Sequence, residues 1–166
     1  NPACGLPAQL TTGLAALGNV TSYTDTTLNP NIGYLYSVSA LDAAGNESIQ
    51  SSIKTITTPP VPDTTAPTVS VTAPAASSEV KGSSVNLTAT ATDNVAVASV
   101  QFYLNYQGNP ASQKLGPSLT SASGNAYIYA WDTTTLGNGN HSLTAIATDT
   151  SGNTSTSTTI TVTVNN

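Results

Sequence analysis

The feature of this sequence that most constrains its fold is an alternation of apolar and polar residues over short runs in its second half. Apolar residues occupy every second position in five runs: Val69 and Val71; Val85, Leu87, Ala89 and Ala91; Ala98, Val100, Phe102 and Leu104; Leu143, Ala145 and Ala147; Ile160, Val162 and Val164. A period of two gives a β-strand one apolar face, and that face must be buried against a second layer. Because turns of Gly, Asn, Asp and Pro separate the runs, the spacing predicts an antiparallel β-sandwich.

The predicted secondary structure is all-β along the whole chain. In the first half, strands are expected at residues 21–28, 34–40 and 51–58. In the second half, they are expected at residues 68–72, 84–92, 97–104, 126–132, 141–148 and 156–164. Apolar residues at helical intervals occur only in the short stretch 10–17, so the fold class remains all-β.

A cluster of prolines divides the chain. Pro59, Pro60, Pro62 and Pro67 are interleaved with Thr and Asp residues, and a proline cannot donate a hydrogen bond to a sheet. We therefore expect an extended, semi-rigid connector at residues 59–67. The predicted organisation is two antiparallel β-sandwich domains in tandem, formed by residues 1–58 and 68–166.

The composition excludes several classes of partner. Charged residues are only 7% of the chain, whose net charge is −5, and the sequence has no Arg. Nucleic acid is not an expected partner, because binding phosphates requires clustered basic residues. No apolar run approaches the roughly 20 residues of a membrane-spanning helix. The sequence starts at Asn1 without an initiator Met, which favours a processed product.

The residues that catalysis requires are sparse. His141 is the only histidine and stands at the start of an expected strand, so we expect it to be structural. Glu47 and Glu79 fall in different predicted domains, where they do not form an acid and base pair. Cys4 is the only cysteine, which excludes a disulfide within the chain and a multi-cysteine metal site. The chain is therefore predicted not to be an enzyme and to need no catalytic cofactor.

One stretch of the first half resembles a known structural corner. Leu28, Pro30 and Tyr34, followed by Val38 and Ala40, have the spacing of the corner between the E and F strands of a fibronectin type III domain. In that motif the Tyr hydroxyl bonds back to the backbone of the corner. Residues 40–48 also resemble the following turn in bacterial members of the family, and the resemblance covers roughly residues 20–58.

The second half resembles the bacterial Ig-like repeats. The stretches that carry this resemblance are residues 63–67, 91–95, 131–135, 139–141 and 147–153. The likeness covers nearly the whole of residues 63–166. Such repeats are accessory modules of secreted glycosidases, proteases and adhesins. The resemblance therefore implies a bacterial-type protein that is secreted or carried on the cell surface.

The first domain is expected to be incomplete. A fibronectin type III domain has about 90 residues and roughly seven strands, whereas only some 58 residues precede the connector. An open sandwich leaves apolar surface and backbone groups uncovered. We expect an upstream or separately encoded chain to supply the missing strands. Strand exchange between copies of the chain comes second, and folding back of residues 4–19 comes third.

Three aspartates are expected to meet at one pole of the second sandwich. In an Ig-like course, the start of strand A, the B–C loop and the F–G loop lie at the same end. This gathers Asp63, Asp93 with Asn94, and Asp149 beside the connector. The preferred interpretation is that each Asp caps its own turn. The alternative is that the converging carboxylates bind Ca²⁺ and stiffen the hinge.

Aromatic residues cluster on the expected neighbouring strands of the second domain: Tyr103, Tyr106, Tyr127, Tyr129 and Trp131. An exposed row of rings would stack on sugar faces, as in polysaccharide-binding modules. Aromatic pairs across strands also stabilise sheets, and Trp131 has a framework position in the resemblance to Ig-like repeats. Packing is therefore the preferred interpretation of Tyr103, Tyr127, Tyr129 and Trp131, and carbohydrate binding is the alternative.

These expectations favour a structural function. The chain is predicted to be a building block of a surface filament or pilus, or a spacer of a modular adhesin, in which a partner complements the strands of the first domain. Low surface charge supports association, because like molecules then repel each other weakly. The alternative is a carbohydrate-binding accessory module of a secreted polysaccharide hydrolase.

Overall fold

The computed structural model describes residues 21–106, 112–120 and 123–166. All regular secondary structure in these residues is β, which confirms the predicted fold class. No helix in the described part of the chain is long and apolar enough to cross a membrane. Cys4 and the stretch 10–17 lie outside the described residues. The chain divides into two compact units, Asn1–Pro62 (unit 1) and Asp63–Asn166 (unit 2).

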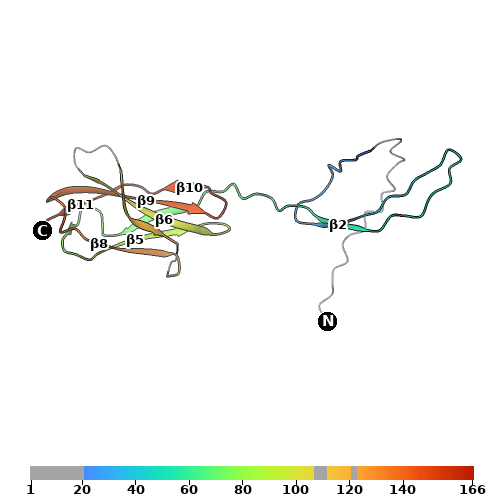
Figure 1. Cartoon of the computed structure of the whole chain (residues 1–166). Helices are drawn as coiled ribbons and strands as arrows, with labels where there is room; N and C mark the ends of the chain where they lie inside the picture. The colour runs from blue at the N-terminus through green and yellow to red at the C-terminus, as the bar shows by residue number, and fades with distance from the viewer. Residues whose placement is uncertain (1–20, 107–111, 121–122) are drawn as a thin grey trace. The chain divides into compact units, whose positions relative to one another are not determined.

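Unit 2 is a sandwich of two sheets (Figure 1). The smaller sheet has the order β3-β5-β8, made by β3 (Thr68–Ala73), β5 (Val85–Thr92) and β8 (Ala126–Trp131). The larger has the order β4-β11-β9-β6-β7, with β10 also paired to β9. Its strands are β4 (Glu79–Val80), β6 (Val97–Tyr106), β7 (Gln113–Leu119), β9 (Gly139–Asp149), β10 (Thr154–Thr156) and β11 (Ile160–Val164). All pairs are antiparallel except β4 with β11.

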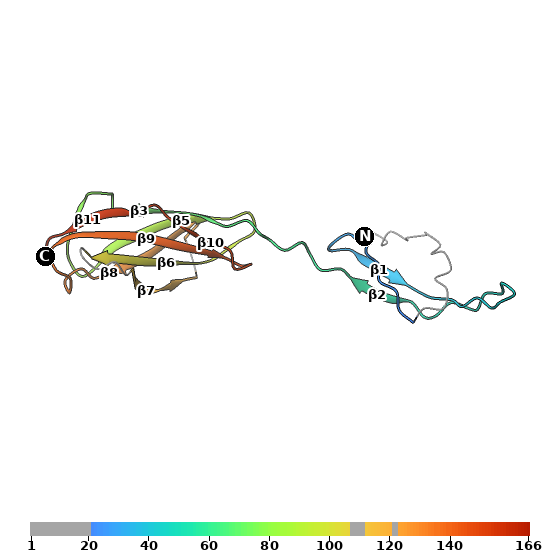
Figure 2. The same cartoon turned by 90° about the horizontal axis from the view of Figure 1, so that it is seen from above.

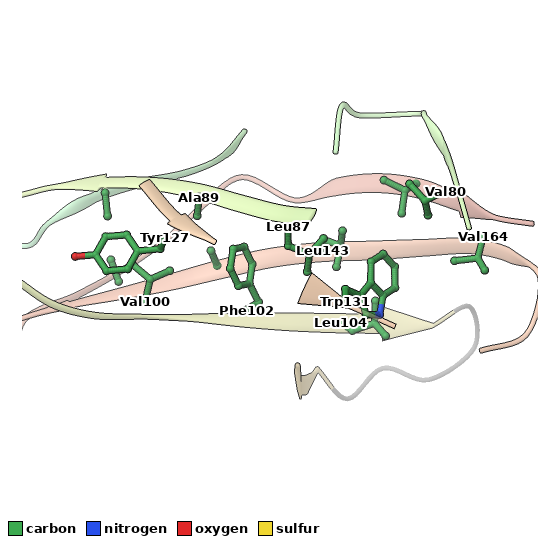
Figure 3. Packing of buried hydrophobic residues seen from close by; sticks show 14 residues of the cluster. Val80, Leu87, Ala89, Val100, Phe102, Leu104, Tyr127, Trp131, Leu143 and Val164 are labelled. Carbon is green, nitrogen blue, oxygen red and sulfur yellow. The ribbon is translucent and has the colours of Figure 1, made fainter. Parts of the chain in front are cut away.

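The core of unit 2 follows the alternation in the sequence. Along β5 and β9 every second residue is buried, and these residues face their counterparts on the opposite sheet (Figure 3). Trp131 and Phe102 are the largest side chains in this core. The other buried apolar residues are Val80, Leu87, Ala89, Ala91, Val100, Leu104, Tyr127, Leu143, Ala145, Ala147, Val162 and Val164. Removing this apolar surface from water is the main favourable contribution to the stability of unit 2.

Three strands of unit 2 were not expected from the sequence. β10 overlaps the expected strand at 156–164 only at Thr156, because residues 157–159 separate it from β11. β4 has only two residues, which is too few to show a period. β7 contains Gly116 and Pro117 and pairs with β6 alone in the larger sheet, through a register shift. Gly116 has a φ of 69°, and a Cβ at this position would overlap the ring of Tyr129. This irregular edge strand tolerates a proline, and therefore lacks the alternation that marks the others.

The described residues of unit 1 form one antiparallel pair of strands (Figure 2). β1 (Gly33–Tyr36) pairs antiparallel with β2 (Lys54–Thr57). The strand expected at residues 21–28 is not formed, because this segment pairs with no strand among the described residues. The predicted corner is confirmed, since the backbone N–H of Asn29 donates to the Tyr34 hydroxyl at 2.8 Å. Leu28 is half-buried and Pro30 is exposed at this corner.

The boundary between the units lies inside the predicted connector. Residues 63–67 belong to unit 2 rather than to a free linker. Pro67 is buried, and the backbone carbonyl of Asp63 accepts a hydrogen bond from the Asn153 side chain at 3.1 Å. These contacts with the sandwich explain why the prolines alone did not mark the boundary.

Candidate metal centre

Three loops of unit 2 converge at the pole where β3 begins. Thr68 of β3 pairs with Thr92 of β5, and Val97 of β6 pairs with Asp149 of β9. The residues just outside these pairs are therefore brought together, as the sequence predicts for an Ig-like course. One carboxylate oxygen from each of Asp63, Asp93 and Asp149 lies within 4.8 Å of the others.

Each aspartate uses one oxygen to cap its own turn. Asp63 Oδ1 accepts from the Thr65 N–H at 3.0 Å. Asp93 Oδ2 accepts from the N–H groups of Val95 and Ala96 at 2.9 and 3.1 Å. Asp63 and Asp93 therefore both cap their own turns. The same holds for Asp149, whose Oδ1 accepts from the N–H groups of Ser151 and Asn153, both at 2.8 Å.

Capping leaves a second oxygen free on two of the three carboxylates. Asp63 Oδ2 and Asp93 Oδ1 are buried and have no hydrogen-bond partner in the described part of the chain. Asp149 is 2% exposed, and its Oδ2 accepts from Asn153 Nδ2 at 2.7 Å. Buried oxygens of ionised groups need a partner, because their lost hydration is otherwise uncompensated.

The charges of these groups also repel each other. Two like charges about 4 Å apart repel by about 1 kcal/mol in water and by more at a partly buried site. Burial alone would raise the pKa of Asp149, but the hydrogen bonds from the Asn153 side chain, the Asn153 backbone and the Ser151 backbone outweigh it and lower that pKa. The ionised form of Asp149 is therefore favoured by its hydrogen bonds.

Asn153 joins the start of unit 2 to the loop after β9. Its Nδ2 donates to Asp149 Oδ2, to the carbonyl of Asp63 at 3.1 Å and to the carbonyl of Thr65 at 3.4 Å. Sequence reasoning missed this role. The signal was available, because Asp149 and Asn153 enclose a D-x-x-G-N loop that also occurs in unit 1 at residues 42–46.

Tyr103, Tyr127, Tyr129 and Trp131 do not form the exposed row of rings that the carbohydrate-binding alternative requires. Tyr127 and Trp131 are buried in the core, so neither offers a ring face to a sugar. Tyr129 is half-buried over Gly116 on the same side of β8. Tyr103 lies on the other side of β6 from the buried Phe102 and Leu104. Alternation along two different sheets therefore separates the rings, and the preferred packing interpretation holds for Tyr127 and Trp131.

His141 is part of the packing rather than of a catalytic arrangement. It is buried, and its Nε2 lies 2.9 Å from the carbonyl oxygen of Gly137. Its ring centroid lies 4.8 Å from that of Tyr106 and 6.5 Å from that of Trp131. Glu79 accepts a hydrogen bond from Asn165 at 3.0 Å, at the C-terminal end of the chain.

Comparison with known proteins supports the predicted relationship. Residues 67–145 match the family model of the bacterial Ig domain. The chain therefore contains an Ig-like domain in unit 2, as its sequence motifs indicated. Exoglucanase B of Cellulomonas fimi is 34% identical over 88 residues, a stretch that covers 53% of this chain and 8% of that enzyme.

The chain is also similar, at low sequence identity and with TM-scores below 0.5, to several solved structures. The fibronectin(III)-like modules of Clostridium thermocellum CbhA are 21% identical with a TM-score of 0.43, covering 58% of this chain and 94% of theirs. A tetra-tandem repeat of a large adhesion protein is 22% identical with a TM-score of 0.45, and the match covers 80% of this chain and 31% of that one. A Ca²⁺-stabilized adhesin of an ice-binding Antarctic bacterium is 19% identical with a TM-score of 0.43, covering 80% and 32%.

Proposed function

We propose that this chain is a non-catalytic extracellular spacer, and that its Ig-like domain binds Ca²⁺ through Asp63, Asp93 and Asp149. Bacterial Ig domains are typically extracellular modules without catalytic activity. Extracellular modules bind Ca²⁺ with dissociation constants of about 10⁻⁴ to 10⁻³ M. A site built from a few carboxylates and completed by water suits that range.

The observation that supports the proposal is that the two oxygens of the Asp63 and Asp93 carboxylates have different surroundings. One oxygen of Asp63 and of Asp93 is fixed by its turn, and the other is buried without a partner. The turn hydrogen bonds therefore orient the free oxygens before any ion arrives. Ca²⁺ takes six to eight oxygen ligands at flexible geometry, so backbone carbonyls and water would fill the remaining positions.

A cation at this pole would act mechanically. It would tie residues 63–65, which lead into β3, to the loops that follow β5 and β9. The contacts of Asn153 with Asp63 and Thr65 already hold the same segment. Pro59, Pro60 and Pro62 would then form the remaining connector, whose restricted backbone keeps it extended. A module of this kind sets the spacing within a long adhesin, a filament or a secreted enzyme.

The match to exoglucanase B favours a second candidate, an accessory module of a secreted polysaccharide hydrolase. Sugar binding in that setting would have to use Tyr103, Tyr106 or Tyr129, because Tyr127 and Trp131 are buried. Pull-down on insoluble cellulose and chitin separates the two candidates. Retention that disappears in Tyr103→Ala, Tyr106→Ala or Tyr129→Ala supports the second candidate, and passage of the protein through both matrices supports the spacer.

The Ca²⁺ site is tested by titration calorimetry and thermal unfolding with a matched pair of variants. Asp149→Asn removes a negative charge and one carboxylate oxygen from the site, whereas Asp42→Asn makes the same change in the equivalent loop of unit 1. We expect Ca²⁺ binding to the wild type and to Asp42→Asn, and none to Asp149→Asn. With Ca²⁺ at about 100 times its dissociation constant, unit 2 should gain about 2.7 kcal/mol. Absence of binding heat together with an unchanged midpoint in the wild type would refute the site.

A further inference from the structure

Unit 1 exposes most of the large apolar side chains that the structure leaves in solvent. Nine of the twelve exposed large hydrophobic residues in the described ranges belong to it. They are Tyr23, Ile32, Leu35, Val38, Leu41, Ile49, Ile53, Ile56 and Val61. Scattered exposed apolar residues are ordinary, but a concentration over so short a segment marks a surface that is normally covered.

The face that needs covering is defined by the tyrosine corner. Tyr34 pairs with Ile56 and Tyr36 with Lys54, so their side chains share one face of the β1–β2 hairpin. The segment 21–28 crosses this face, because Tyr34 accepts from the Asn29 N–H and the Tyr36 hydroxyl donates to Asp25 Oδ2 at 3.2 Å. We call this side of the hairpin the corner face. Ile56 on the corner face remains 49% exposed.

The described residues of unit 1 therefore form parts of two layers, the β1–β2 hairpin and the segment 21–28 that crosses it. The first layer holds only β1 and β2, and an isolated two-stranded hairpin is marginally stable in water. The second layer is represented by residues 21–28, whose backbone pairs with no strand in the part of unit 1 that is described. Unit 2 closes one core between its two sheets, whereas the described residues of unit 1 form a single two-stranded sheet. Within residues 21–62, neither layer has the strands that a closed sandwich requires.

We propose that unit 1 is the C-terminal half of a β-sandwich, and that polypeptide preceding Asn1 in the same protein supplies the other half. The incoming strands would pair with the free edge of β1 and with residues 21–28, and would lay an apolar face on the corner face. The Ca²⁺ site plays no part in this inference, which concerns unit 1 alone.

The charges of unit 1 favour a covalently attached occupant over a separate protein. The Asp25 carboxylate accepts a hydrogen bond from Thr27, that of Asp42 accepts from its own loop, and that of Glu47 accepts from Ser39. These carboxylates are engaged locally, so they offer little to steer a separate partner into register. A segment of the same chain needs no steering, because its effective concentration is in the millimolar range or above.

The experiment compares the 166-residue chain with the same chain extended by about 50 residues of its own upstream coding sequence. We expect the shorter chain to be a monomer that binds the dye ANS and exchanges its β1–β2 amides rapidly. The extended chain should lose most of the dye binding and slow these amides on the order of 100-fold. An extension that changes neither dye binding nor exchange overturns the proposal.

Two other outcomes for the shorter chain also contradict it. A dimer with protected β1–β2 amides would mean that a second copy covers the corner face. A monomer with protected amides and no dye binding would mean that residues 1–20 cover it.

A matched pair of variants in the extended chain sharpens the result. Ile56→Asp places a charge on the corner face, and Ile128→Asp places one on β8 of unit 2 at a similar exposure of 53%. Only Ile56→Asp should restore dye binding and rapid exchange of the β1–β2 amides.

Discussion

The two units carry the same five-residue loop in different surroundings. In residues 42–46 and 149–153, the Asp Oδ1 accepts from the backbone N–H groups two and four positions later, and its Oδ2 accepts from the Asn side chain at 2.7 Å. Both glycines have positive φ, 86° and 92°. Asp42 is exposed, however, whereas Asp149 is buried beside Asp63 and Asp93.

The loop sequence determines the hydrogen bonds inside the loop, whereas the surrounding sandwich determines which groups lie beside its carboxylate. The D-x-x-G-N sequence produces the same internal hydrogen bonds in both units, because these bonds are local. The neighbours of the carboxylate depend instead on strand pairs that bring distant loops to one pole. Unit 2 supplies those pairs through β5, β6 and β9. The loop therefore lies beside two further carboxylates only in unit 2, where strand pairs bring the other loops to it.

The largest expected difference between the units concerns identical truncations of leucine. Leu87 on β5 is fully buried, and Leu35 on β1 is 52% exposed. Leu87→Ala should lower the free energy of unfolding by about 2–5 kcal/mol, because it removes buried surface and leaves a cavity. Leu35→Ala should change it by less than about 0.5 kcal/mol. Urea unfolding followed by Trp131 fluorescence measures the loss in unit 2, and hydrogen exchange of the β1–β2 amides measures the loss in unit 1. Equal losses in the two units would contradict the contrast in burial.

A smaller effect is expected from two glycines of unit 2. Gly116 and Gly124 have similar positive φ angles, 69° and 64°, but a Cβ would overlap the Tyr129 ring only at Gly116. Gly124→Ala should cost about 1 kcal/mol of stability through the backbone alone. Gly116→Ala should cost about 2–4 kcal/mol, because the ring must also move. Thermal unfolding of both variants tests this ranking, and Tyr129→Ala should remove the difference between them.

The two loop asparagines provide the next comparison. Asn153 bridges Asp149, Asp63 and Thr65, whereas Asn46 Nδ2 bonds Asp42. Asn153→Ala should destabilise unit 2 by about 1–3 kcal/mol, because it leaves buried acceptors without a donor. Asn46→Ala should leave the unfolding midpoint of unit 2 unchanged. An equal effect of both variants on that midpoint would show that the bridge contributes nothing.

The smallest effect is expected from acid. Hydrogen bonds lower the pKa of Asp149 despite its burial, so its ionised form stabilises the fold. That stability is fully present above the pKa of an unfolded Asp, about 3.9, and is lost as pH falls through the lower folded value. The thermal unfolding midpoint of unit 2 should therefore decrease as the pH is lowered below about 4. Asp149→Asn should flatten this part of the profile, and Asp42→Asn should not.

Much of the fold could be predicted because the responsible signals are local. Alternation located the core strands of unit 2, and the Leu28, Pro30 and Tyr34 spacing located a corner that the Asn29 to Tyr34 hydrogen bond confirms. β7 was missed because its Gly116 and Pro117 disturb any period. The segment 21–28 was wrongly predicted as a strand, because alternation reports a preference whereas a strand also requires a neighbour.

The residues of the candidate site could be predicted from the sequence, but the surroundings of their individual oxygens could not. The order of strands was enough to gather Asp63, Asp93 and Asp149 at one pole. Which oxygen of each carboxylate remains free was not predictable, because it depends on the direction of each turn. The sequence also could not separate the aromatic rings, since Tyr103 and Tyr127 belong to different sheets and alternation does not say which side of a sheet faces the core.

The central claim is that unit 2 is a closed domain with a cation site and unit 1 is an open half. It is tested most directly by differential scanning calorimetry of the intact chain in about 10 mM Ca²⁺ and in EDTA. We predict one cooperative transition, from unit 2, whose midpoint is about 10 °C higher in Ca²⁺. Two cooperative transitions, or a single midpoint that is the same in both buffers, would contradict the claim.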